Sequence, residues 1–136
     1  MYLDMWYPAP FTIRGNKFDC VGHYIAYRRA IAVKDIKIAN YIKHEHVMHL
    51  VRALGDSCDA EKCSTWHTTY GVHLEDAVRA KFMQNDDLLE VFLTSSDIVK
   101  SALRSENDDF ARFAILKIHA QFKRDRSMSN WLRRTV

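Results

Sequence analysis

The stretch Ala80-Lys81-Phe82-Met83-Gln84-Asn85-Asp86-Asp87-Leu88-Leu89-Glu90-Val91-Phe92-Leu93-Thr94 decides how this chain folds. It predicts the end of one helix, a polar break, and a second, short amphipathic helix. Asn85 is a residue type favoured at helix N-caps, and Asp86 and Asp87 then fall in the first turn, where negative charge is stabilising. The apolar face of the second helix follows a spacing of three and four residues and consists of Leu88, Leu89, Phe92 and Leu93.

The composition predicts one soluble globular domain over residues 1–136. Apolar residues make up 48% of the chain and charged residues 27%, and four glycines and two prolines leave little material for long loops. The apolar runs are shorter than a membrane span, and the first residues lack the pattern of a signal peptide. Three cysteines at irregular spacing indicate reduced thiols. We therefore expect a cytoplasmic protein without a membrane partner.

The net charge of +3 is unevenly distributed. Residues 111–136 contain seven basic residues and one acidic residue. A basic helix or tail over about residues 123–136, with Trp131, suits contacts with nucleic-acid phosphates. A solvated helix end explains the same pattern and is the favoured interpretation.

The expected fold class is α+β and predominantly helical, with a small N-terminal β-hairpin. Gly15-Asn16 lies between two short alternating runs, which is typical of a two-residue hairpin. Asp19 is a residue type that caps helices, and the apolar period predicts a helix over about residues 20–33. Further helices are expected over residues 35–42, 44–54, 70–83, 97–103 and 110–122, with Gly55 as a C-terminal cap and a loop over residues 56–68.

The histidines and cysteines do not form a convincing metal site or nucleophile. Structural zinc sites pair closely spaced ligands, but the spacing of Cys58 and Cys63 is wide and no second pair follows His67. His44, His46 and His49 do not share one helix face. Proximity of a cysteine to a histidine in sequence is no evidence of a catalytic dyad. We therefore expect neither a metal nor a cofactor.

Two groups of residues suit a ligand with a flat ring and phosphates. Trp66 suits stacking on a base, although a buried plug that pins its loop is the favoured alternative. His23, Tyr24 and Arg28, with Tyr27 and Arg29, offer aromatic faces and cations. An ordinary helix with Tyr24 in the core and Arg29 in solvent is the slightly favoured alternative.

Several segments, taken in order, resemble the NADAR superfamily, also called YbiA-like. Leu3–Phe11 with the hairpin resembles the family opening "LSNFYPSPF…DG", and Val21-Gly22-His23-Tyr24 resembles "VEHYYQA". Ala80-Lys81-Phe82-x-Gln84-Asn85-x-x-Leu88 resembles "AKFxQNxxL", and Trp66 matches the tryptophan of "DWD". The likeness covers about residues 3–94. It implies a mostly helical α+β domain connected with NAD and ADP-ribose, with its nearest kin among small proteins of tailed bacteriophages.

Members of this family act on N-glycosidic bonds, and the resemblance places several polar residues of their site. The family glutamate corresponds to Gly22 and the family glutamine to Ala26, and the aspartates flanking the tryptophan correspond to Thr65 and His67. The glycine-rich loop near the C-terminus is also missing, with Arg112 where its last glycine belongs. Cleavage through a cation-like sugar needs a carboxylate, so no catalytic residue is assigned.

Three functions remain open. We expect first a catalytically reduced NADAR-like domain that binds an ADP-ribose- or NAD-like ligand or a host protein, with His23, Tyr24, Arg28, Trp66 and Lys81 as ligand-binding candidates. The second is an active N-glycosidase whose carboxylate has moved to Glu45, Asp108 or Asp109. The third is a nucleic-acid-binding module that uses the basic C-terminal region.

Overall fold

The computed structural model describes residues 2–95, 97 and 108–135, of which 127–135 are described as backbone. It has a β-hairpin followed by helices, and it confirms the expected helical α+β class. The elements are β1 (Phe11–Ile13), β2 (Asn16–Phe18), α1 (Val21–Ala32), α2 (Ile36–His44), α3 (Met48–Asp56), the 3-10 turn η1 (Ala60–Lys62), α4 (Ser64–Met83), α5 (Asp86–Thr94) and α7 (Asp109–Thr135).

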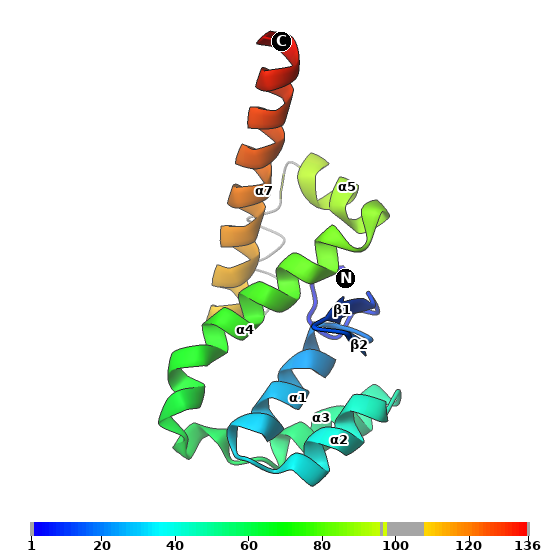
Figure 1. Cartoon of the computed structure of the whole chain (residues 1–136), viewed down its shortest axis with the longest axis vertical. Helices are drawn as coiled ribbons and strands as arrows, with labels where there is room; N and C mark the ends of the chain where they lie inside the picture. Colours follow the sequence, from blue (N-terminus) through cyan, green and yellow to red (C-terminus); the bar gives the residue numbers. More distant parts are fainter. Residues whose placement is uncertain (1, 96, 98–107, 136) are drawn as a thin grey trace.

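Helices α1 and α4 form the centre of the molecule (Figure 1). Helix α1 packs against α2 and α3 on one side and against α4 on the other. Helix α4 also contacts α5, α7 and the hairpin strand β1, and the C-terminal turns of α7 project beyond the rest of the fold (Figure 1). One large core lies around α1, α4 and α7, and a smaller one lies between α1, α2 and α3.

The hairpin lies one residue away from its predicted position. Phe11 pairs with Phe18 and Ile13 with Asn16, so the two turn residues are Arg14 and Gly15. Both have positive φ, 51° for Arg14 and 81° for Gly15, as a type I′ turn requires. The shift places Phe11 and Phe18 together in the core.

The predicted cap at Asp19 is wrong. Cys20 occupies the N-cap position of α1, and no side chain caps the helix there. The Asp19 carboxylate instead pairs with Nδ1 of His46 at 2.8 Å. Helix α2 does have an aspartate cap, because the Asp35 carboxylate accepts a hydrogen bond from the Ile38 N–H at 3.1 Å.

Two predictions around residues 55–68 are also wrong. Gly55 lies inside α3, and Ser57 occupies the C-cap position. A Cβ at position 55 would stand 2.8 Å from Cβ of Ala26. The absence of a side chain here lets α3 pack closely on α1. The predicted loop contains η1 and the first turn of α4, so Trp66 is a helical residue.

The break between α4 and α5 lies where the sequence predicts it, but its polar side chains bond to the N-terminal segment and do not cap α5. Asn85 is at the N-cap position of α5 without a capping hydrogen bond, and its amide donates to the carbonyls of Pro10 and Lys81. Gln84 accepts from the Thr12 N–H at 2.8 Å and donates to the Thr12 carbonyl at 2.9 Å. The end of α4 therefore holds the segment of residues 2–12 through hydrogen bonds from its side chains to the backbone of that segment.

The remaining helix predictions have different outcomes. The helix expected over residues 97–103 lies almost entirely outside the described residues. Helix α7 begins close to its predicted start and continues through the basic region. No helix in the described ranges is long and apolar enough to cross a membrane.

Candidate functional site

A cavity of about 450 Å³ lies where α1, α3, α4 and the beginning of α7 meet. Met5 and Trp6 close it on the side of the 2–12 segment, and Glu61 of η1 contributes to its wall. We call it the α1–α3–α4 cavity. It brings together Gly22, Ala26, Trp66 and His67, which are four of the positions that the NADAR resemblance places at a site.

The indole of Trp6 fills the space that a side chain at position 22 would need. A Cβ on Gly22 would lie 2.5 Å from two indole carbons and 2.7 Å from a third. The backbone holds the two residues together, because the Gly22 N–H donates to the Met5 carbonyl at 2.7 Å. A carboxylate at position 22 is therefore incompatible with the observed position of Trp6.

Arg52 of α3 lies over the ring of the same indole. Its guanidinium carbon is 5.7 Å from the centre of the Trp6 ring, within the range of a cation–π contact. Arg52 and Trp6 thus form one mixed aromatic and cationic wall of the cavity.

Arg29 and Glu61 form an ion pair at the opposite wall. The Arg29 guanidinium donates to the Glu61 carboxylate at 2.6 Å and to the Cys58 carbonyl at 2.9 Å. The Arg29 hydrogen bond lowers the pKa of the Glu61 carboxyl below its usual value. Arg29 is thus not the solvated residue of the favoured helix interpretation, because it joins α1 to η1.

Asp108 lies at the junction of α4 and α7. One of its carboxylate oxygens accepts from the Phe110 N–H at 2.8 Å and from the Ala111 N–H at 3.3 Å, which caps the first turn of α7. The other oxygen accepts a hydrogen bond from the Tyr70 hydroxyl. Of the three carboxylates proposed as relocated catalytic groups, Asp108 is the one that lines the cavity, whereas Glu45 and Asp109 do not line it.

Trp66 lines the cavity but offers little free surface, since only 4% of it is exposed. Its ring packs against Tyr70 and His73, with centroid separations of 5.1 Å and 6.1 Å. The favoured interpretation of Trp66 as a plug is confirmed by this burial, although it pins a helix and not a loop.

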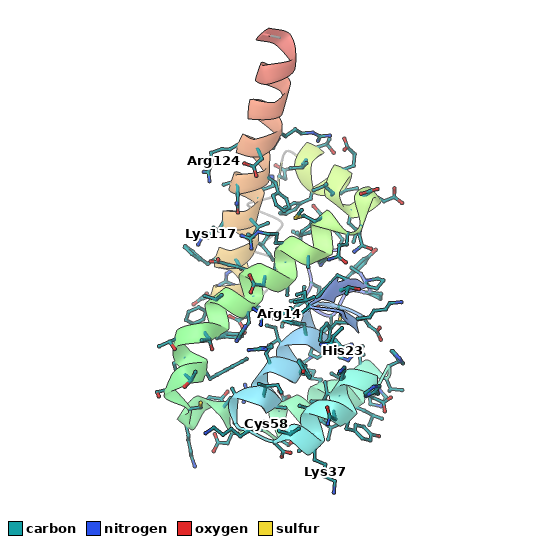
Figure 2. All side chains as sticks on the ribbon, in the orientation of Figure 1. Arg14, His23, Lys37, Cys58, Lys117 and Arg124 are labelled. Carbon is teal, nitrogen blue, oxygen red and sulfur yellow. The ribbon has the colours of Figure 1, made fainter. Side chains whose placement is uncertain are left out.

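His23 does not reach the cavity. It is completely buried, with Nδ1 accepting from the Asp19 N–H at 3.0 Å and Nε2 donating to the Ile42 carbonyl at 2.7 Å. Burial lowers the pKa of His23, so its neutral form joins α1 to the end of α2. Figure 2 shows His23 near the hairpin end of α1 and Cys58 near the other end.

Tyr24, Arg28 and Lys81 also lie away from the cavity wall. Tyr24 packs in the core against Phe18, and burial raises its pKa against the opposing effect of the half-buried Arg28 charge. Lys81 is 2% exposed, and its ammonium donates to the carbonyls of Tyr2 at 2.5 Å and Asp4 at 3.3 Å. Of the five ligand-binding candidates, the structure brings only Trp66 to the cavity.

The cysteines and histidines have ordinary structural surroundings. Within the described part of the chain, no group of three or more His, Cys, Asp or Glu residues is placed to hold a metal ion. Burial raises the pKa of the Cys20 and Cys58 thiols, whereas the backbone N–H of Trp66 lowers that of Cys63. His67 bonds through Nε2 to the Glu61 carbonyl, next to the Arg29 ion pair.

Several basic residues of α7 are already paired within the fold. Lys117 pairs with Glu75 of α4 at 2.9 Å, and Arg126 pairs with Glu90 of α5 at 2.9 Å. Lys123 and Arg124 are exposed, and Figure 2 shows Arg124 on the outer part of α7. The side chain of Trp131 lies outside the described residues.

No protein-family model, no curated protein and no solved structure matches this chain. The NADAR resemblance therefore stays a prediction that rests on the quoted motifs.

Sequence reasoning assigned no part in a binding site to the residues that give the cavity most of its polar and aromatic character. These residues are Trp6, Arg52, Asp56, Glu61 and Tyr70. Arg52 and Asp56 are four residues apart on α3, a spacing that places them on one helix face. That spacing was a usable signal, but nothing local indicated that this face meets Trp6.

Proposed function

We propose that this chain is a catalytically reduced NADAR-like domain that binds a nucleotide-type ligand in the α1–α3–α4 cavity. The observation that carries the proposal is the indole of Trp6 against Gly22. It puts an aromatic surface where the family resemblance would place a carboxylate, so the site favours holding a ring over cleaving a glycosidic bond.

The size and chemistry of the cavity support this proposal. A volume of about 450 Å³ is within the range of small-molecule sites. Trp6 supplies a ring face, and Arg52 and Tyr70 supply polar groups at fixed positions. Stacking of a base on an aromatic side chain contributes about 1–3 kcal/mol, and it does not depend on which base is present.

The experiment is a calorimetric titration of the protein with adenosine, NAD and ADP-ribose, repeated for Trp6→Leu and Tyr41→Leu. Tyr41 is an exposed aromatic residue of α2 outside the cavity, so its replacement is the matched control. We expect binding that weakens about tenfold or more in Trp6→Leu and is unchanged in Tyr41→Leu. No heat and no NMR shift with any of the three ligands at millimolar concentration would refute the proposal.

A second candidate is an N-glycosidase that uses Asp108. It is favoured by the position of that carboxylate in the cavity wall, within reach of the Tyr70 hydroxyl. The hydrogen bonds of Asp108 count against it, because one carboxylate oxygen caps α7 and the other accepts from the Tyr70 hydroxyl. Hydrolysis of an N-ribosyl substrate that is lost in Asp108→Asn and retained in Asp109→Asn would establish this candidate over the first.

A further inference from the structure

The guanidinium group of Arg28 on α1 is half-buried and has no partner in the described part of the chain. Its Nε is buried and donates to no acceptor there, and its terminal nitrogens form no ion pair. The next residue, Arg29, has both the Glu61 carboxylate and the Cys58 carbonyl as partners. Buried polar groups in proteins are nearly always hydrogen-bonded, so the Arg28 Nε–H calls for an acceptor that the described residues do not provide.

Arg28 belongs to a group of polar side chains from three elements. Tyr24 precedes it by one turn of α1, and the Tyr24 ring contacts the His73 ring of α4 at a centroid separation of 6.3 Å. Arg14 is in the hairpin turn, and Figure 2 shows it where the hairpin meets α1 and α4. Burial lowers the pKa of His73, and the charges of Arg28 and Arg14 lower it further. The two guanidinium groups therefore lie close to the same imidazole.

Positive charge exceeds negative charge around His73. Asp76 is the acidic residue that acts on both His73 and Tyr24, and it already pairs with Arg79 at 3.6 Å. Within the ranges that the structure describes, neither Arg14 nor Arg28 has a carboxylate at ion-pairing distance. Two guanidinium groups thus lie near a neutral imidazole without counter-charges of their own.

We propose that Arg14, Arg28 and the ring N–H of His73 bind a phosphate dianion, either free or as the phosphoryl group of a monoester. Arginine presents several N–H donors in a fixed plane that matches phosphate oxygens, and such charge-assisted hydrogen bonds are the strong ones. Two guanidinium groups balance the charge of the dianion. A neutral imidazole has one N–H to donate to it.

This site is separate from the α1–α3–α4 cavity and does not rest on the proposed function. Arg28 follows the cavity residue Ala26 by two positions, which places the two side chains on different sides of α1. Neither Arg14 nor His73 lines the cavity.

The test is an NMR titration of the full chain with sodium phosphate, compared with sodium chloride at the same ionic strength. We expect phosphate alone to give a saturable shift of the Arg28 Nε–H signal and of the His73 ring signals. The pKa of His73 should rise when phosphate is bound, because a nearby anion favours the imidazolium form. Phenyl phosphate distinguishes the two sources: tighter binding than inorganic phosphate identifies a monoester, and weaker binding identifies the free ion.

Three matched variants assign the site. Arg28→Gln and Arg14→Gln should each weaken phosphate binding at least about tenfold, followed at His73, because each removes charge-assisted hydrogen bonds. Arg124→Gln makes the same change at an exposed position on α7, far from the hairpin in Figure 2, and should leave binding unchanged.

The outcomes that overturn the proposal are distinct from those that bear on the cavity. Equal shifts with phosphate and chloride, or no saturable shift at millimolar phosphate, would refute the site using the unaltered chain alone. Phosphate binding that persists unchanged in both Arg14→Gln and Arg28→Gln would refute the assigned residues. A failure of adenosine, NAD and ADP-ribose to bind would remove the proposed function and leave this site standing.

Discussion

Replacing Gly22 by alanine should destabilise the protein only while Trp6 is present. The new Cβ would stand 2.5 Å from the indole, whereas carbon atoms pack best at about 3.5–4.0 Å. The Trp6 backbone cannot move away from α1, because the Trp6 N–H donates to the Asp4 carboxylate at 2.7 Å and the Met5 carbonyl accepts from the Gly22 N–H. The ring therefore has to rotate, and rotation removes its contact with Arg52.

The magnitude follows from two opposing effects. Overpacking of this kind costs about 1–3 kcal/mol, while replacing glycine by alanine in a helix stabilises by up to about 1 kcal/mol. With Trp6 present, we expect a net loss of up to about 2 kcal/mol. In a Trp6→Ala background the clash is absent, so the Gly22→Ala change should be neutral or stabilising.

The assay is a double-mutant cycle with Gly22→Ala, Trp6→Ala and the double variant. Urea unfolding followed by far-ultraviolet circular dichroism gives the four free energies of unfolding, and the expected coupling is about 1–3 kcal/mol. Additivity within about 0.5 kcal/mol would show that the indole does not occupy the space beside Gly22 in solution. It would also remove the observation on which the proposed function rests.

Three other changes test the packing around α1 and α4. Lys81→Met should lower the free energy of unfolding by about 2–5 kcal/mol, because the carbonyls of Tyr2 and Asp4 lose a buried donor. A loss below about 0.5 kcal/mol by urea unfolding would contradict this. Gln84→Ala should raise the rate of amide hydrogen exchange at Thr12. The free energy of unfolding should fall by only about 1 kcal/mol, since water replaces these exposed hydrogen bonds. An unchanged exchange rate would show that Gln84 does not bond to the Thr12 backbone in solution. His23 has a lowered pKa because of burial, so its contribution to stability is complete above its ordinary value of 6.5 and is lost as pH falls below it, by up to about 1.4 kcal/mol per pH unit. A urea midpoint that stays constant from pH 7.5 to 5.5, or an imidazolium nitrogen signal for His23 at pH 6, would refute that assignment.

The helical framework could be predicted because its signals are local. The apolar periods of α1 and of the stretch around α4 and α5 repeat every three or four residues, and they fall where the structure has helices. The start of α4 gave no such signal. Its first turns bury Trp66 but expose Ser64, Thr65, His67 and Thr68, so the sequence there has the composition of a loop.

The cavity could not be predicted because it depends on contacts between distant residues. Gly22 is explained by Trp6, and Gly55 by Ala26, and neither partner is marked by spacing along the chain. The roles predicted for the polar residues of the stretch 80–94 were wrong for the same reason. Asn85 is a residue type favoured at N-caps, yet its side-chain amide donates to the Pro10 carbonyl, which is 75 residues away in sequence.

The hold of α4 on the 2–12 segment has a consequence for synthesis on the ribosome. Thr12 is separated by 72 residues from Gln84, so its hydrogen-bonding partner does not yet exist when the segment leaves the exit tunnel. At about 5–20 residues per second, the segment waits roughly 4–15 seconds for that partner. During this interval α1 and α3 are synthesised, but α4 is not yet there to hold the segment that carries Trp6, so the aromatic surface that later walls the cavity is exposed to chaperones and to other nascent chains.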